Sequence, residues 1–278
     1  MISSKKIPIL MYHSISEHAS KKFQSFAVAP ALFTEQLEYL KQQNYTPMTV
    51  TQMIQARAQG GSMLPAKPVV LTFDDGFADF YTHAFPILQK YAFVATLYVT
   101  TAYVNGTSRW LRSEGEANRL MVTWDQLIEM SAWGIECGAH THTHPQLDVI
   151  SPARAREEIV QSKQILEQQL RKEVVSFAYP FGYQTAETRQ IVQEAGYTSA
   201  CAVKHKMSTL ESDLFALERF KVDSQSHSDV FAALLVDRNL SAAMAMQKLY
   251  LRTRTPLWQC ARRSTVSLAH MFFHGGRP

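Results

Sequence analysis

The sequence VVLTFDDG at residues 69–76 decides the fold, because an apolar run of strand length ends there in two aspartates and a glycine. Further apolar runs predict strands along the chain, at 7–12, 93–99, 135–137, 174–178, 197–203 and 217–222. Amphipathic spacing and capping residues predict helices between them, at 30–43, 79–91, 123–133, 151–172, 185–195, 227–237 and 240–251. Continuously apolar strands that alternate with helices are typical of a parallel sheet buried on both faces, so the sequence predicts an α/β fold.

Polar or turn-forming residues follow four of the predicted strands. They are His13, Asp74-Asp75-Gly76, His140-Thr-His-Thr-His144 and Tyr179-Pro-Phe-Gly182. In parallel α/β sheets, functional residues gather at the carboxyl ends of the strands. We therefore expect these four segments to meet at one rim of the sheet.

Asp74 and Asp75 suggest a metal site at that rim. Burying two adjacent carboxylates is unfavourable unless a cation or hydrogen bonds compensate. Since successive strand residues point in opposite directions, one aspartate can bind a metal while its neighbour meets the metal-bound water from another side. The alternative is that an aspartate only caps the helix predicted after it. The strand before it and the histidines elsewhere favour the metal site.

The three histidines at 140, 142 and 144 allow more than one arrangement. In an extended chain all three would face one side, whereas in a helical turn His140 and His144 would align and His142 would point away. Pro145 limits any helix to a single turn. The spacing leaves these pairings open. Asp plus two His forms a set of three ligands with open positions, which suits catalytic Zn²⁺ and other divalent first-row ions.

Three segments resemble the first three motifs of the NodB-like polysaccharide deacetylases, carbohydrate esterase family 4. They are Leu71–Gly76, Gly138–Pro145 and Ala178–Gly182, within a resemblance that covers about residues 5–225. The resemblance implies a single distorted TIM-like barrel of the (β/α)7 type that binds Zn²⁺, Co²⁺ or Ni²⁺. It implies that Asp74 is the general base and that Asp75, His140 and His144 are the metal ligands. It also implies that Tyr179, Pro180 and Phe181 line the acetyl-binding groove, with a backbone N–H near Tyr179 at the oxyanion.

The sequence departs from the family pattern at two positions. The family's third motif begins with an arginine that pairs with the base, and here that residue is Ala178. The family's late Leu-x-His, which supplies the general acid, is also missing. Leu10-Met-Tyr-His13 instead resembles the circularly permuted branch that includes poly-N-acetylglucosamine deacetylases. The resemblance to that branch makes His13 the general acid and leaves open what orients Asp74.

Composition sets the domain organisation. The 278 residues are 46% hydrophobic and 19% charged, enough for a sizeable core. We expect one deacetylase domain at 5–238 and a basic helical extension at 239–278, which carries six Lys/Arg and no Asp/Glu. The extension is expected to pack on the barrel; the alternative is contact with an anionic membrane or carrier lipid.

Three widely separated cysteines indicate neither a disulfide framework nor a cysteine zinc site. Without a signal peptide or membrane span, we expect a cytoplasmic protein.

These features predict a metal-dependent deacetylase that hydrolyses N-acetyl groups of an N-acetylglucosamine-type glycan. One alternative is a metal-dependent amidohydrolase that acts on a small amide or a lipid-linked sugar. Another is a non-catalytic glycan-binding module, which the intact aspartates and histidines argue against. The sequence contains no phosphate-binding glycine loop and no nucleic-acid motif, so we expect no nucleic-acid partner.

Overall fold

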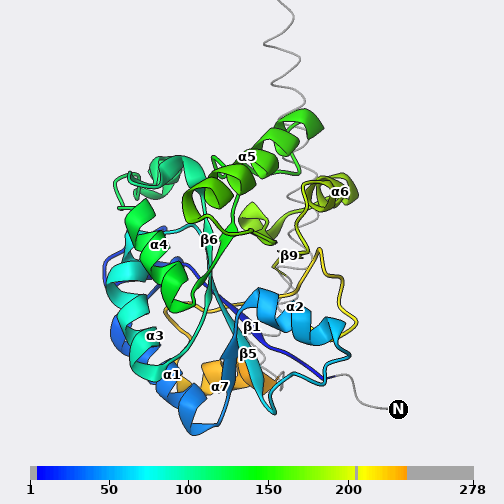
Figure 1. Cartoon of the computed structure of the whole chain (residues 1–278). Helices are drawn as coiled ribbons and strands as arrows, with labels where there is room; N and C mark the ends of the chain where they lie inside the picture. The colour runs from blue at the N-terminus through cyan, green and yellow to red at the C-terminus, as the bar shows by residue number, and fades with distance from the viewer. Residues whose placement is uncertain (1–4, 204–205, 237–278) are drawn as a thin grey trace, which may run out of the picture.

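The fold is a curled, parallel α/β sheet surrounded by helices, seen in a computed structural model that describes residues 5–203 and 206–236 (Figure 1). The strands of the main path are β1 (Ile9–Tyr12), β5 (Pro68–Phe73), β6 (Thr96–Val99), β7 (Glu136–Ala139), β8 (Ser176–Ala178), β9 (Ser199–Cys201) and β10 (Phe220–Lys221). Their order in the sheet is β10-β1-β5-β6-β7-β8-β9, and every pair is parallel. Seven strands on one parallel path confirm the predicted α/β barrel class.

Segment 217–221 joins the two ends of this path. Leu217 forms a parallel bridge with Cys201 of β9, and Phe220 of β10 pairs with Leu10 of β1. A short β4 (Thr46–Met48) pairs with the start of β5, and β2 (Ser14–Ile15) pairs with β3 (Ala27–Val28) in a separate two-stranded sheet. The sheet therefore curls back on itself, and the segment that joins its ends lies beside β1.

The helices around the sheet are α1 (Pro30–Gln42), α2 (Val50–Ala58), α3 (Phe85–Tyr91), α4 (Trp124–Trp133), α5 (Pro152–Leu170), α6 (Ala186–Glu194) and α7 (Ser228–Val236). Their starts follow local sequence signals. Thr49, Thr123 and Thr185 each form a capping box, and Ser151 caps α5 ahead of a proline at its first position. The helix expected at 79–91 is divided: a π-helix (Phe80–Ala84) precedes α3, in which Pro86 stands near the start.

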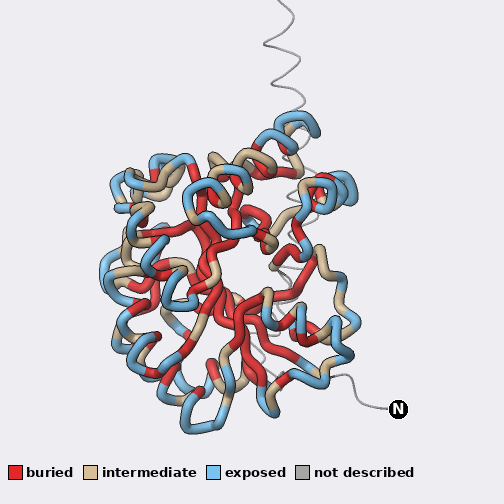
Figure 2. Tube along the Cα trace, in the orientation of Figure 1, coloured by how far each residue is buried: buried red, intermediate tan, exposed pale blue. Residues whose placement is uncertain are grey.

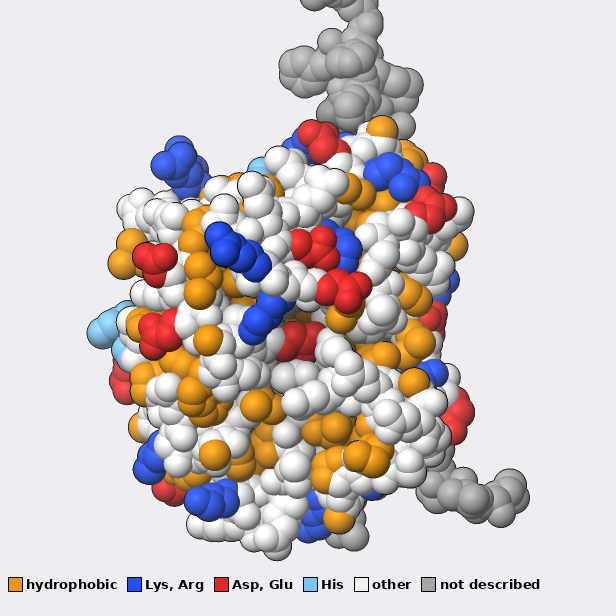
Figure 3. Space-filling model, viewed as in Figure 1, with side chains coloured by type: hydrophobic (Ala, Val, Ile, Leu, Met, Phe, Trp, Pro, Cys, Tyr) orange, Lys and Arg blue, Asp and Glu red, His pale blue; other side chains and the backbone are white. Residues whose placement is uncertain are grey.

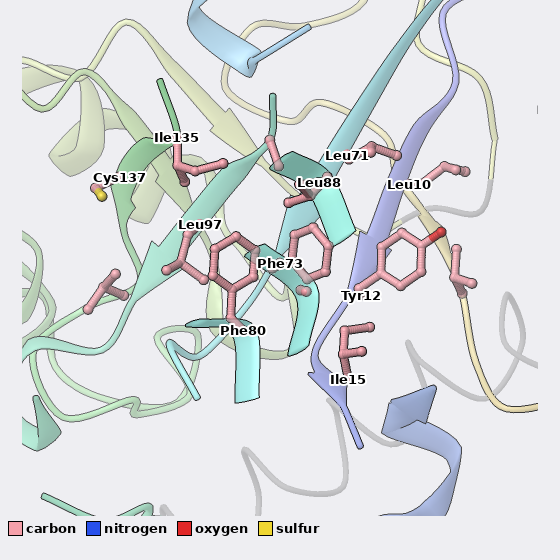
Figure 4. Close-up of a cluster of buried hydrophobic side chains, with 14 of the residues drawn as sticks. Leu10, Tyr12, Ile15, Leu71, Phe73, Phe80, Leu88, Leu97, Ile135 and Cys137 are labelled. Atoms are coloured by element: carbon pink, nitrogen blue, oxygen red, sulfur yellow. The ribbon is translucent and has the colours of Figure 1, made fainter. Parts of the chain in front are cut away.

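Both faces of the strands are buried, as their continuous apolar character predicted. Leu71, Phe73 and Leu97 belong to an outer cluster under the helices, which Figure 4 shows, whereas the alternate residues Val70 and Tyr98 belong to an inner cluster. Figure 2 shows the strands largely buried and most exposed residues in the surrounding helices and loops. The inner cluster lies beneath the rim where the four predicted site segments end.

Several sequence predictions differ from the structure or lie outside its described residues. The strands expected at 197–203 and 217–222 are shorter than predicted, and helix α2 and strand β4 were not predicted. The helix expected at 240–251 and the basic extension at 239–278 lie outside the described residues.

Within the described residues, no helix combines the length and apolar composition needed to cross a bilayer. On the face seen in Figure 3, basic side chains lie among acidic ones rather than in one patch.

Candidate active site

Asp75, His140 and His144 converge at the rim of the sheet. Nε2 of His140 lies 3.5 Å from Oδ1 of Asp75, and Nε2 of His144 lies 3.2 Å from the same oxygen. One donor atom from each residue lies within 4.8 Å of the others. One carboxylate and two imidazoles at these separations surround a single point, which is the geometry of a three-ligand metal site.

Backbone conformation brings Asp75 into this group. Val70 and Thr72 of β5 face the inside of the barrel, and Asp74 continues that face. Strict alternation would turn Asp75 outward. Asp75 instead has φ of 77°, in the left-handed region that non-glycine residues rarely adopt, and Gly76 follows at 85°. Strain of this kind is expected where the surroundings over-determine a functional residue.

The loop 140–144 is neither the extended chain nor the helical turn that the spacing allowed. Thr141 and His144 both have left-handed φ values, 67° and 61°, which turn His140 and His144 toward Asp75. The Nδ1 atom of His142 pairs instead with Oγ1 of Thr101 at 2.9 Å. The structure therefore brings His140 and His144, and not His142, close to Asp75.

Buried hydrogen bonds hold the loop in this shape. The Thr143 N–H and hydroxyl both donate to the Glu158 carboxylate, at 2.6 Å each, and Glu158 is buried on α5. The Thr141 hydroxyl accepts a bond from the His144 N–H at 3.1 Å. Such supporting bonds set the orientation of metal ligands and the affinity of the site.

His140 presents a lone pair to the centre of the site. Its Nδ1 lies 2.8 Å from the Ala178 carbonyl oxygen, which can only accept, so Nδ1 carries the proton. Burial lowers the pKa of His140 to about 4, so the ring is neutral near pH 7 and Nε2 is unprotonated. The oxygen and nitrogen donors of this set fit a divalent zinc-type ion.

Arg219 holds the predicted base Asp74. Its two Nη atoms donate to the two carboxylate oxygens of Asp74, each at 2.7 Å, and both side chains are buried. Burial raises the pKa of Asp74, but the charge and hydrogen bonds of Arg219, with His140 and His13, outweigh it and the pKa is lowered. Asp74 thus has a buried guanidinium as its partner although position 178 is an alanine.

The sequence contained a signal for Arg219 that was not used. Arg219 is the one basic residue in Leu217-Glu-Arg-Phe220, inside a segment predicted to be a buried strand. A guanidinium in such a segment requires a buried anion as its partner. The sequence indicated less strongly that Glu158 is buried, because it lies on a helix whose other polar residues mostly face solvent.

His13 stands beside Asp74 at the rim. Tyr12 pairs with Phe73 in the parallel register of β1 and β5, and the Asp74 N–H donates to the Tyr12 carbonyl at 3.0 Å. The ring of His13 meets Phe26 edge-on at 4.9 Å. Burial lowers the pKa of His13, while Asp75 and Asp74 act in the opposite direction. This position lets His13 face the two aspartates from the neighbouring strand.

The segment 179–181 differs from its expected role. Tyr179 is fully buried, its hydroxyl donates to the Phe215 carbonyl and its N–H donates to the Cys201 carbonyl at 3.1 Å. Tyr179 therefore offers neither its side chain nor its N–H to a substrate, and Pro180 is also buried. Phe181 is 53% exposed, has φ of 61° and lies 5.0 Å from the ring of His144. Of the three predicted groove residues, only Phe181 faces the site.

Trp110 also packs against His144. The indole lies 5.3 Å from the His144 ring and stacks on Phe77 at 6.2 Å. Trp110 belongs to the 3-10 helix η4 (Arg109–Glu114), in the polar segment 103–120. The rings of Phe181 and Trp110 therefore both pack close to the ring of His144.

Comparisons with known proteins identify the family of this chain. Residues 62–200 match the family model for polysaccharide deacetylase. A Streptococcus pyogenes deacetylase, PplD, solved in complex with acetate, is 30% identical with a TM-score of 0.73; the match covers 84% of this chain and 99% of PplD.

Two further relatives extend the match. A polysaccharide deacetylase structure from Bacillus cereus is 27% identical with a TM-score of 0.71, over 84% of this chain and 69% of that one. A poly-beta-1,6-N-acetyl-D-glucosamine N-deacetylase from Staphylococcus aureus is 24% identical over 75% of this chain and 72% of its own length. This chain therefore belongs to the polysaccharide deacetylase family, as its motifs predicted, and is a deacetylating hydrolase.

Proposed function

We propose that this protein is a metal-dependent N-deacetylase that releases acetate from N-acetylglucosamine residues of a glycan. The observation that carries the proposal is the convergence of Asp75, His140 and His144 beside an aspartate that is aimed by a buried arginine. The similarity to the Staphylococcus aureus poly-beta-1,6-N-acetyl-D-glucosamine N-deacetylase supports the choice of substrate.

Asp75, His140 and His144 would hold the ion. When bound, a divalent ion at this position supplies Lewis acidity and lowers the pKa of water that it binds. His140 meets the requirement for a ligand, since its Nε2 is unprotonated and its ring is fixed through Nδ1. Zn²⁺ is the expected ion, with Co²⁺ or Ni²⁺ as substitutes.

Asp74 accepts the proton of the attacking water. Arg219 keeps the Asp74 carboxylate ionised and fixes the directions of both its oxygens. A base with only one accessible orientation loses little entropy when it meets the water. His13 then donates a proton to the departing sugar amine, because an amine anion is too basic to leave unprotonated.

Phe181 and Trp110 shape the place of the acetyl methyl. Their rings lie 5.0 and 5.3 Å from the ring of His144. An apolar wall there favours a methyl group over a longer polar chain. Phe181 is the exposed residue of the two, so it also offers a face for a sugar ring to stack on.

Acetate release from N-acetylglucosamine oligomers tests the proposal. We expect chelated protein to be inactive and added Zn²⁺ or Co²⁺ to restore acetate release. Asp74→Asn should abolish turnover and retain the metal, whereas Asp75→Asn or His144→Ala should lower the metal content measured by mass spectrometry. An active Asp74→Asn enzyme, or full metal stoichiometry without Asp75 and His144, would refute these roles. Acetate released from small amides but not from oligomers would move the substrate class away from glycans.

A further inference from the structure

Arg119 lies at the centre of a charged network beside the catalytic rim. Its Nη1 donates to the Ser14 hydroxyl and to Asp79 Oδ2, both at 3.0 Å, and its Nη2 donates to the His18 carbonyl at 2.8 Å. Its side chain is 11% exposed, and that of Asp79 is 10% exposed. The guanidinium also lies over the ring of Phe23 at 5.0 Å. A guanidinium with this many partners has little freedom to move.

The network is hydrogen-bonded to the two residues that follow His13. Asp79 accepts a hydrogen bond from the Ser14 hydroxyl at 2.6 Å and another from the Ile15 N–H at 3.1 Å. Asp79 itself stands four residues after Asp75, at the start of the π-helix. The same ion pair therefore connects the chain after His13 to the chain after the two site aspartates.

Within the described part of the chain, the ring of His13 has no hydrogen bond at Nδ1 to hold it. The Nδ1 atom of His13 is buried and has no hydrogen-bond partner among the described residues. In contrast, Nδ1 of His140 is fixed by the Ala178 carbonyl. The backbone before His13 is fixed by the pairing of β1 with β5 and β10, and the backbone after it is fixed by Ser14 and Ile15.

We propose that Arg119, acting through Asp79 and Ser14, is a positioning residue that holds His13 where it can protonate the leaving amine. The inference rests on the proposed function, and in particular on His13 as the proton donor. Arg119 closes the polar segment 103–120, which also places Trp110 against His144. The segment 103–120 thus supports two parts of the proposed site: Arg119 supports the proton donor His13, and Trp110 packs against the metal ligand His144.

The surroundings of Arg119 define an alternative role that the experiment must separate. Arg119 lines an open polar hollow of about 560 Å³ between residues 16–20 and 115–119. If Arg119 bound the glycan there, its loss would raise KM and leave kcat unchanged. If it only stabilised the fold, its loss would reduce every activity of the enzyme alike.

Two substrates with different leaving groups separate these roles. Loss of acetate from an N-acetylglucosamine oligomer requires protonation of the amine, whereas 4-nitrophenolate leaves 4-nitrophenyl acetate without a proton. We expect Arg119→Met to lower kcat on the oligomer about 10- to 100-fold, part of the 10²–10⁴ typical of general acid catalysis. Activity on the ester should change less than about threefold, because it does not use that proton. Metal content should equal that of the wild type.

Matched variants complete the experiment. His13→Ala should show the same substrate contrast more strongly, and adding Arg119→Met to it should have no further effect on kcat. Ser14→Ala, a much smaller change, should reproduce the contrast if Arg119→Met fails to fold. Arg112→Met, an exposed arginine of the same segment, should leave both activities unchanged.

Two results would overturn the proposal. Equal losses on oligomer and ester, in both Arg119→Met and Ser14→Ala, would show a general structural role. A rise in KM alone would show that Arg119 binds the glycan. Wild-type enzyme that releases no acetate from the oligomer, but hydrolyses the ester, would refute the function on which the inference depends.

Discussion

Replacing Arg219 with methionine would test the most buried charge pair of the site. Methionine keeps much of the side-chain length and removes every hydrogen-bond donor. The change would leave the Asp74 carboxylate buried, 3% exposed, without the two bonds of 2.7 Å that now neutralise it. It would also remove the bonds from Arg219 to the Thr72 hydroxyl and the Ala202 carbonyl.

The size of the effect follows from the burial of both partners. Breaking a buried ion pair by removing one partner reduces the free energy of unfolding by about 3–5 kcal/mol. For a domain near this size, each kcal/mol lowers Tm by about 2–4 °C, so the expected drop is roughly 6–20 °C. Activity should fall about 10²–10⁴-fold as well, because burial without Arg219 raises the pKa of Asp74 and the base loses its fixed direction.

Thermal and urea unfolding of chelated protein would measure the stability term without metal binding. The surface pair Arg156–Glu194 provides the control, since its side chains are 50% and 41% exposed and Arg156→Met should change stability by less than about 1 kcal/mol. Asp74→Ala combined with Arg219→Met removes both charges and should be more stable than Arg219→Met alone. A loss below about 1 kcal/mol for Arg219→Met, or no recovery in the double variant, would refute the assignment of Arg219 as the buried partner of Asp74.

Three further predictions concern the metal and the loops that support it. Zn²⁺ at 100 times its Kd should stabilise the chelated protein by about 2.7 kcal/mol, a rise seen in thermal unfolding that should disappear in His144→Ala; persistence of the rise would place the metal elsewhere. Glu158→Gln should weaken Zn²⁺ binding about 10- to 100-fold in a competition assay with a chromogenic chelator, because the carboxylate that holds Thr143 loses its charge, and an unchanged Kd would show that the loop needs no such support. Burial raises the pKa of Cys137 to about 12 and that of Cys201 to about 11, so in a Cys260→Ser variant neither thiol should react with iodoacetamide at pH 8 until urea unfolds the protein; rapid native labelling would contradict their burial.

The rim of the sheet was predictable because it depends on short-range patterns. Apolar runs located the strands, and the polar residues directly after them had to lie at one edge once the sheet was parallel. Helix α2 was missed although Thr49-x-x-Gln52 is a capping box, since its buried residues Val50, Met53 and Ala56 form a sparse stripe. Strand β4 is three residues long and contains a proline, so it carries almost no pattern.

The details of the site depended on contacts that no local pattern contains. The choice among the three histidines follows from left-handed backbone at Thr141 and His144, which neither a helical nor a strand period describes. The N–H of Tyr179 donates to the Cys201 carbonyl, a pairing between β8 and β9 that no local pattern predicts. Arg219 lies 145 residues from Asp74 along the chain, and only the curl of the sheet brings them together.

Ala178 and Arg219 are two parts of one solution to the charge of Asp74. Both belong to the inner side of the barrel: Ala178 ends β8, and Arg219 lies on the segment that joins β9 to β1. A single buried carboxylate can neutralise one guanidinium, and a second one there would be an unpaired buried charge. Arg219 supplies that one guanidinium from the closing segment, and position 178, where the family motif has its arginine, is a small neutral residue here. The buried carboxylate of Asp74 is thus neutralised by a cation that comes from the segment joining β9 to β1.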